Sequence, residues 1–150
     1  MAEPYCLAMV LCDNVHRDGA TGKCTLLGTF SALHPRTLPA KVRFCVYAEV
    51  TDGTGEVEFV LQIVESRSLL DDSGDEPFVW RPPPESLPKV NLRDPLAVLQ
   101  LTCLCSMELP KAGQYHCELL ANGTLLMARR IVVFPPREEE SDSPKKAEGE

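Results

Sequence analysis

The sequence predicts an all-β protein, an immunoglobulin-like sandwich of two antiparallel sheets with seven to eight short strands. Apolar and polar residues alternate with a period of two through most of the 150 residues, as in strands that bury one face. Thirteen prolines and nine glycines supply turns at short intervals and disfavour long helices. Many short strands joined by turns are typical of a sandwich.

The clearest strand spans residues 41–50, and its partner spans residues 56–65. One face of the first strand is apolar, with Val42, Phe44, Val46, Ala48 and Val50. The second strand likewise places on one face Val57, Phe59, Leu61 and Ile63. The intervening TDGTG has the glycines that a tight turn requires. We therefore predict that these two strands pair as a hairpin.

A second hairpin is predicted over residues 113–134. Asn122-Gly123 is a strong turn signal, and β-branched residues gather in the strand that follows it. Arg129 and Arg130 are adjacent in this strand, so one of them must face the wrong side unless a bulge intervenes.

Two further regions complete the set of predicted strands. Residues 95–109 are long enough for a helix, but their two-fold alternation favours a strand. Its apolar face would hold Leu99, Leu101, Cys103, Cys105 and Met107. Residues 5–12 and 24–33 are predicted to form another strand pair at the front of the chain.

The segment 67–95 is predicted to be irregular, with a short edge strand at PFVW. The triplet Pro82–Pro84 marks a sheet boundary or a polyproline segment, because proline cannot donate to a strand ladder. From Pro135 onward only Ala147 offers an apolar side chain for burial. We expect one sandwich domain over residues 1–134 and a disordered acidic tail over 135–150.

The stretch ELPKAGQYHCEL contains Gly113-x-Tyr115-x-Cys117. A tyrosine two residues before a cysteine in a late strand resembles the tyrosine corner of immunoglobulin-type sandwiches, in which the phenol hydroxyl binds the backbone just upstream. The chain departs from antibody domains because its only tryptophan, Trp80, lies beside the prolines. The resemblance therefore implies the architecture and not an antibody-type domain.

Three stretches also resemble a small family of uncharacterised bacterial proteins known only as a domain of unknown function. They are LCDNVHRDGATGKCTLLGTFSAL, FCVYAEVTDGTGEVEFVLQIV and AGQYHCELLANGTLL. The resemblance implies a stand-alone β-sandwich, and it brings no activity and no site residues with it.

Charge and hydropathy disfavour several classes of partner. The net charge is −7, and no basic stripe of the kind that binds nucleic acid accompanies it. No apolar run approaches the roughly 20 residues of a membrane span. The N-terminus carries Glu3 in place of a basic region, so we interpret it as a first strand and not as a signal peptide. We expect a cytoplasmic protein with its seven cysteines reduced, the alternative being a secreted, disulfide-linked one.

The loop over residues 13–23 has the composition of a ligand site. Its glycines, Gly19 and Gly22, are three residues apart and a strand-like segment follows, which does not fit a phosphate-binding loop. A calcium site would need Asp13 and Asp18 to converge with acids of other loops, such as Asp52, Asp71 and Asp72. We interpret the loop as a hairpin turn.

Metal and catalytic sites have little support in the sequence. Cys103, Cys105 and Cys117 could share a face, but His116 would point away from them, so we expect buried apolar thiols, a disulfide between neighbouring strands being the alternative. The other histidines, His16 and His34, lie in separate elements. We therefore expect no catalytic residue, no metal and no cofactor.

By elimination, the sequence favours a non-catalytic protein-interaction or accessory module with an unknown protein partner. Trp80 and Arg81 are candidate partner-binding residues, because these residue types anchor interfaces. The competing interpretation is that Trp80 plugs one end of the core. The alternative functions are a calcium- or lipid-binding C2-like sandwich and an enzyme whose site assembles from scattered loop residues.

Overall fold

The structure is a computed structural model that describes residues 3–67, 76–87 and 89–137. These residues form ten strands and one short 3-10 helix, and eight of the strands have four residues or more. The elements are β1 (Tyr5–Arg17), β2 (Cys24–Thr29), β3 (Ala32–Leu33), β4 (Ala40–Thr51), β5 (Gly55–Glu65), β6 (Val79–Trp80), η1 (Pro84–Ser86), β7 (Lys89–Leu92), β8 (Leu99–Leu109), β9 (Gly113–Ala121) and β10 (Thr124–Val133).

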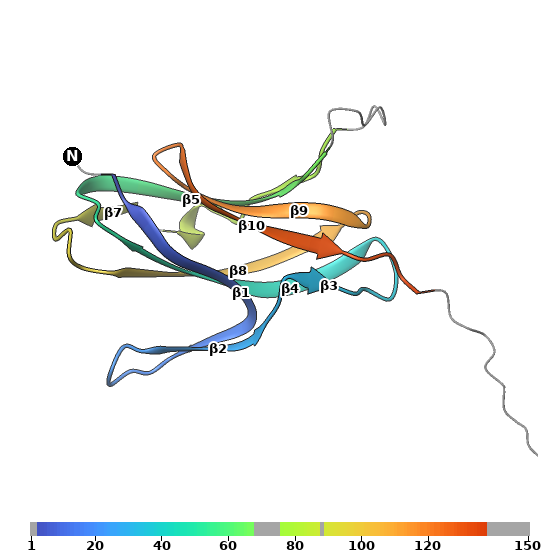
Figure 1. The fold of residues 1–150 in the computed structure, drawn as a ribbon, viewed down its shortest axis with the longest axis horizontal. Helices are drawn as coiled ribbons and strands as arrows, with labels where there is room; N and C mark the ends of the chain where they lie inside the picture. The colour runs from blue at the N-terminus through green and yellow to red at the C-terminus, as the bar shows by residue number, and fades with distance from the viewer. Residues whose placement is uncertain (1–2, 68–75, 88, 138–150) are drawn as a thin grey trace, which may run out of the picture.

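The strands form two sheets that pack face to face (Figure 1). One sheet has four strands in the order β2-β1-β4-β8. The other has six, in the order β3-β10-β9-β5-β6, with β7 paired to the other half of β5. All pairings are antiparallel except that of the two-residue β3 with β10. The prediction of an all-β sandwich is confirmed.

The predicted hairpin of residues 41–50 with 56–65 is wrong. In the structure β4 lies between β1 and β8, whereas β5 pairs with β9 in the opposite sheet. The turn between them carries the chain across the sandwich, and the Asp52 N–H donates to the Pro95 carbonyl at 3.0 Å. The alternation of apolar and polar residues could not distinguish a β4–β5 hairpin from strands in opposite sheets, because both arrangements bury the same apolar faces.

The second predicted hairpin is confirmed, since β9 and β10 pair around Asn122 and Gly123, both of which have positive φ. The Asn122 side chain also ties this turn to β5: it accepts from the Glu58 N–H and donates to the Glu56 carbonyl. The ladder shifts register between Leu125 and Met127, a few residues before the two arginines.

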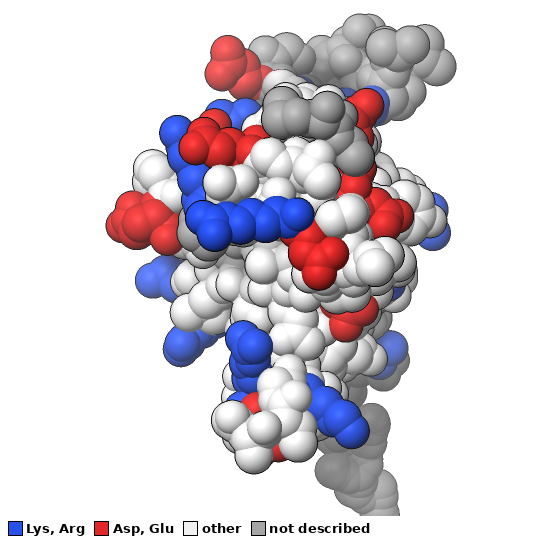
Figure 2. Space-filling view, turned by 90° about the vertical axis from the view of Figure 1, so that its left-hand side faces the viewer, with Lys and Arg blue, Asp and Glu red and all other residues white. Residues whose placement is uncertain are grey.

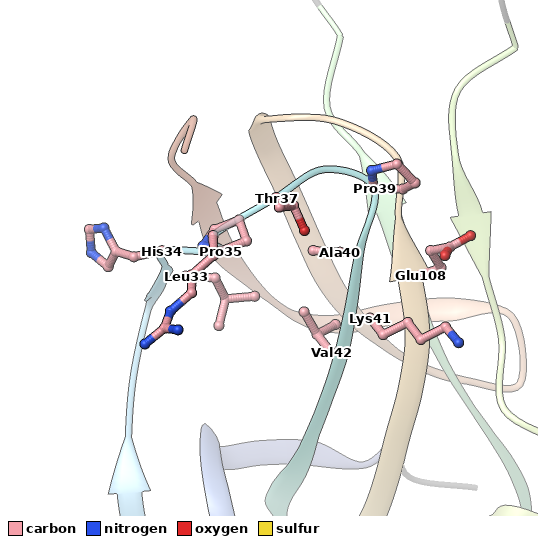
Figure 3. A pocket seen from close by; sticks show the side chains of 10 residues that line it. Leu33, His34, Pro35, Thr37, Pro39, Ala40, Lys41, Val42 and Glu108 are labelled. Carbon is pink, nitrogen blue, oxygen red and sulfur yellow. The ribbon is translucent and has the colours of Figure 1, made fainter. Parts of the chain in front are cut away.

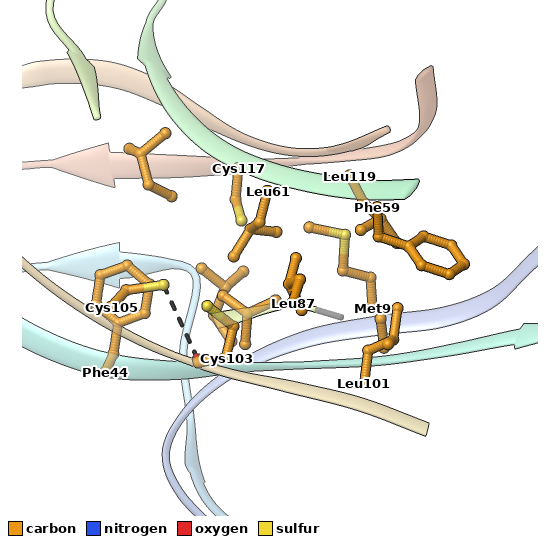
Figure 4. Packing of buried hydrophobic residues seen from close by; sticks show 14 of the residues in the cluster. Met9, Phe44, Phe59, Leu61, Leu87, Leu101, Cys103, Cys105, Cys117 and Leu119 are labelled. Atoms are coloured by element: carbon orange, nitrogen blue, oxygen red, sulfur yellow. Dashed lines mark hydrogen bonds between the residues drawn. The ribbon is translucent and has the colours of Figure 1, made fainter. Parts of the chain in front are cut away.

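The core between the sheets is apolar and contains four of the cysteines, Cys6, Cys103, Cys105 and Cys117, the last three of which are labelled in Figure 4. The predicted inward face of residues 95–109 is confirmed, because β8 alternates between buried and exposed positions. In Figure 4, Cys103 and Cys105 rise from β8 while Cys117 descends from the opposite sheet. Leu87, just after η1, lies between the two sheets beside Leu61 and Leu101.

The tyrosine corner predicted from Gly113-x-Tyr115-x-Cys117 is present in the structure. Tyr115 is fully buried, and its hydroxyl donates to the Lys111 carbonyl at 2.6 Å. Burial raises the pKa of this phenol, so it stays a neutral donor. The bond fixes the turn between β8 and β9.

The predicted pairing of residues 5–12 with 24–33 is largely wrong. Residues 5–12 of β1 pair with β4, and residues 32–33 form β3 in the other sheet. The partner of β2 is the extension of β1 over residues 12–17, and the two form a long arm. Figure 1 shows this arm curling beneath the four-stranded sheet. Its Cys24 lies 3.6 Å from the side-chain oxygen of Gln100 on β8, at the far edge of that sheet. Under the arm, Cys12, Cys45 and Tyr47 are buried outside the main core cluster.

Candidate functional site

The region predicted as a loop over residues 13–23 is the end of β1, up to Arg17, followed by a hairpin turn over residues 18–23. The Asp18 N–H donates to the Lys23 carbonyl at 2.8 Å, and the Asp18 carboxylate accepts from the hydroxyl and the N–H of Thr21. The hydrogen bond from the Thr21 hydroxyl lowers the pKa of Asp18. The carboxylate is thus engaged within its own turn.

The candidate calcium ligands lie on separate elements. Asp13 and Asp18 belong to the β1–β2 arm, Asp52 to the β4–β5 turn, and Asp71 and Asp72 lie outside the described residues. Within the described ranges, no three His, Cys, Asp or Glu side chains are grouped to hold a metal ion.

The three cysteines considered as metal ligands, Cys103, Cys105 and Cys117, are buried free thiols. Burial raises the pKa of Cys117 to about 12, and a hydrogen bond with Cys103, together with burial, raises that of Cys105, whereas the same hydrogen bond lowers the pKa of Cys103. A protonated thiol is a poor metal ligand and a poor nucleophile. His116 points away from Cys117, since the cysteine is fully buried whereas the histidine is half-exposed.

Ser66 and His116 lie 50 residues apart, and no sequence pattern predicts that they meet. The Ser66 hydroxyl and Nδ1 of His116 form a short hydrogen bond across the end of the β5–β9 ladder. A serine beside a histidine is half of a nucleophile and base pair. Neither residue lines any of the grooves described below, however, so the bond fastens two strand ends on a half-exposed sheet face.

The structure separates the two candidate partner-binding residues. Trp80 pairs with Ile63 in the β5–β6 ladder and is half-buried against the core. Arg81 is exposed, and its Nε donates to the side-chain oxygen of Gln62 at 2.9 Å. Only Arg81 faces a groove on the surface.

We call this groove the proline groove; its volume is about 420 Å³. It is lined by Glu58, Phe59, Val60, Leu61, Gln62, Arg81, Pro82, Pro83, Pro84, Leu87, Leu120 and Gly123. It exists because β7 pairs with β5 up to Glu58 and β6 pairs with it only from Ile63. Between β6 and β7, Pro82–Pro84 have no N–H to donate to the strand ladder, so this segment does not pair with β5 and a groove is left beside that strand.

Polar groups mark the two ends of the proline groove. Gln62 accepts from Arg81 and donates to the Glu118 carboxylate at 2.7 Å, so it holds the guanidinium in place. Arg81 has no other hydrogen bond or ion pair with the described residues, which leaves its terminal nitrogens available. Glu58, four residues from Gln62 along β5, lies about 13 Å away at the other end.

A second hollow region, the basic end, lies where β10 ends and where β3 leads into β4. A groove of about 500 Å³ runs from Leu33 to Val42 and reaches Glu108 (Figure 3). A neighbouring hollow of about 800 Å³ shares three residues with it, His34, Pro35 and Arg36, and adds Phe134, Pro135 and Arg137. The His34 and Phe134 rings stack with their centroids 4.8 Å apart.

The face shown in Figure 2 mixes Lys and Arg with Asp and Glu over its upper half. Its lower projection, the tip of the β1–β2 arm by its place in Figure 1, carries Lys and Arg beside uncharged surface. Among the described residues, no helix has the length and apolar character needed to cross a bilayer.

The fold and its surface thus define a β-sandwich with a groove beside an oriented arginine. The chain belongs to a family of unknown function, DUF6941, whose family model matches residues 7–134. This match confirms the resemblance to a family of unknown function. No curated protein matches the chain.

Proposed function

We propose that the protein is a non-catalytic interaction module that binds an extended segment of another protein in the proline groove. We place it in the cytoplasm and, on the strength of the tyrosine corner, among sandwiches of immunoglobulin-like architecture. We further infer a bacterial origin from the resemblance of its sequence motifs. The single observation that carries the binding proposal is the oriented, otherwise unpaired Arg81 at the end of an apolar groove.

The chemistry of the groove specifies the segment it would accept. A carboxylate suits the terminal nitrogens of Arg81, because an arginine held through its Nε can still form two parallel hydrogen bonds. Apolar side chains suit the floor of Val60 and Leu120 and the rigid wall of Pro82–Pro84. An extended segment of about four residues fits, since Glu58 and Gln62, which holds Arg81, are four strand residues or about 13 Å apart along β5.

A non-catalytic role agrees with the composition of the groove. It holds two ionisable side chains, Arg81 and Glu58, and no histidine, serine or cysteine. The nearest thing to a catalytic pair, Ser66 and His116, is not part of its lining. Binding and not bond cleavage is what these groups support.

The test is selection of peptides from a random displayed library on the wild-type protein, followed by counter-selection on R81E. The matched control is R130E, because Arg130 is also an exposed arginine of the same sheet and lies on β10, outside the groove. Selected peptides should carry an acidic residue near apolar ones. They should bind R81E at least about tenfold more weakly and R130E as well as wild type.

Two results would overturn the proposal. One is a library that yields no peptide with measurable affinity for the wild-type protein. The other is a set of peptides that bind R81E and wild type equally, because the arginine would then have no part in recognition.

A further inference from the structure

The basic end carries cations that nothing in the described residues neutralises. Arg36 and Arg137 are exposed, and neither forms a hydrogen bond or an ion pair with any described residue. The one acid in the lining, Glu108, lies opposite Lys41 in the β4–β8 ladder. Figure 3 shows Glu108 and Lys41 turned to one side of the groove and His34 to the other.

The same hollow offers an apolar surface beside these charges. Phe134 is 43% exposed, and His34 stacks on it with an angle of 6° between the ring planes. Pro35 and Pro135 complete the lining. A segment that combined carboxylates with a flexible backbone could therefore lie over the ring pair while its charges met the arginines.

Such a segment begins at the next residue of the chain. Residues 138–142 read EEESD, four carboxylates in five positions directly after Arg137. Five residues span at most about 17 Å, and the hollow itself begins at Arg137, so Arg36 is within reach. A tethered segment of this length acts at a high effective concentration, which favours it over a free ligand.

We propose that Glu138–Asp142 dock in the basic end and neutralise Arg36 and Arg137. The tail then covers the His34–Phe134 pair and keeps other acidic segments out of this hollow. This inference is independent of the function proposed for the proline groove, because the two sites share no lining residue.

The test compares full-length variants by amide chemical shifts of isotope-labelled protein. E138Q/E139Q/E140Q removes the charges nearest the groove, and E148Q/E150Q is the matched control farther along the tail. The first variant should shift the amides of residues 33–37 and of Phe134, whereas the control should leave them in place. Raising NaCl from about 0.1 to 1 M should reproduce the first pattern, because the Debye length falls from about 10 to 3 Å.

A charge exchange makes the test specific. R36E should shift the same amides as the glutamine variant, and R36E/R137E combined with E138K/E139K/E140K should restore the wild-type positions. Docking is contradicted if the glutamine variant leaves residues 33–37 unshifted. It is also contradicted if the shifts depend on protein concentration, which would mean that the tail binds a second copy.

Discussion

The proline groove and the basic end both present arginines to solvent, but they hold them differently. Arg81 is fixed through Gln62 and Glu118 beside an apolar wall, whereas Arg36 and Arg137 have no partner in the described residues. The first site is organised before a ligand arrives, whereas no described residue orients the arginines of the second, which lie beside the stacked His34 and Phe134 rings. A fixed donor with apolar surroundings recognises geometry, while loose exposed charges attract any anion and respond to salt.

The largest effect should come from removing the support beneath the proline wall. Leu87 is buried between the sheets, directly after η1, so L87A should lower the free energy of unfolding by about 2–5 kcal/mol. Binding of a selected peptide should weaken as the wall loosens, while the amides of the basic end should not shift. Denaturant unfolding and peptide titration measure the two effects.

If the peptide binds L87A as tightly as wild type, the wall contributes nothing to recognition. Val60→Ala is the comparison variant: it removes an apolar side chain from the groove floor, but Val60 is not part of the core cluster, so it separates loss of lining from loss of core packing.

A smaller effect is expected at the tyrosine corner. Y115F leaves the partly buried Lys111 carbonyl without its donor, which should cost about 1–2 kcal/mol of unfolding free energy. Peptide binding at the proline groove should not change, because Tyr115 is not in its lining. Thermal unfolding compared with that of Tyr5→Phe, an exposed tyrosine, checks the prediction. Equal stability of both variants would show that the corner bond adds nothing.

Loss of the orienting amide should have a more modest effect on binding alone. Q62L removes the acceptor for Arg81 and the donor to Glu118, and we expect peptide affinity to fall roughly fivefold, or about 1 kcal/mol. Calorimetric titration measures the change. An unaltered affinity would mean that Arg81 needs no fixed orientation, and the contrast between the two sites would then disappear.

The smallest effect concerns acid stability. Burial tends to raise the pKa of Glu65, but hydrogen bonds from the Phe78 N–H, Arg67 and Lys111 outweigh it and lower the pKa. A lowered folded-state pKa gives stability that is present above the unfolded-state pKa and is lost as pH falls through the folded-state value. E65Q should therefore flatten the acid limb of the stability–pH curve below about pH 4.5. An unchanged acid limb in urea unfolding would contradict this.

The alternation of apolar and polar residues predicted most strands, because each strand buries one face. The hydrogen bond of the tyrosine corner was predicted from one local motif, Gly113-x-Tyr115-x-Cys117. Alternation could not predict which strands pair, so β4 and β5 were placed in one hairpin when they lie in opposite sheets. The extension of β1 to Arg17, which forms the arm with β2, was also not predicted. The bend of this arm needs Gly28 at positive φ, where a Cβ would collide with Asp13, and only tertiary structure brings Cys24 to Gln100.

The candidate site was predicted only in part. The sequence suggests Arg81 only by its residue type beside the prolines, and its partner-binding role stays a prediction. Its neighbours Gln62 and Leu120 depend on the β5–β9 register, which the sequence does not encode locally. Trp80 packs against the core instead. Ser66 and His116 are 50 residues apart and meet only through that same register.

The most direct test of binding in the proline groove is an amide-shift titration of the labelled full-length protein with a selected peptide. The account predicts that the shifts concentrate on residues 58–62, 81–87 and 120–123, and that R81E abolishes them while R130E does not. Shifts confined to residues 33–37 and 134–137 would contradict it, because the peptide would then be bound at the basic end.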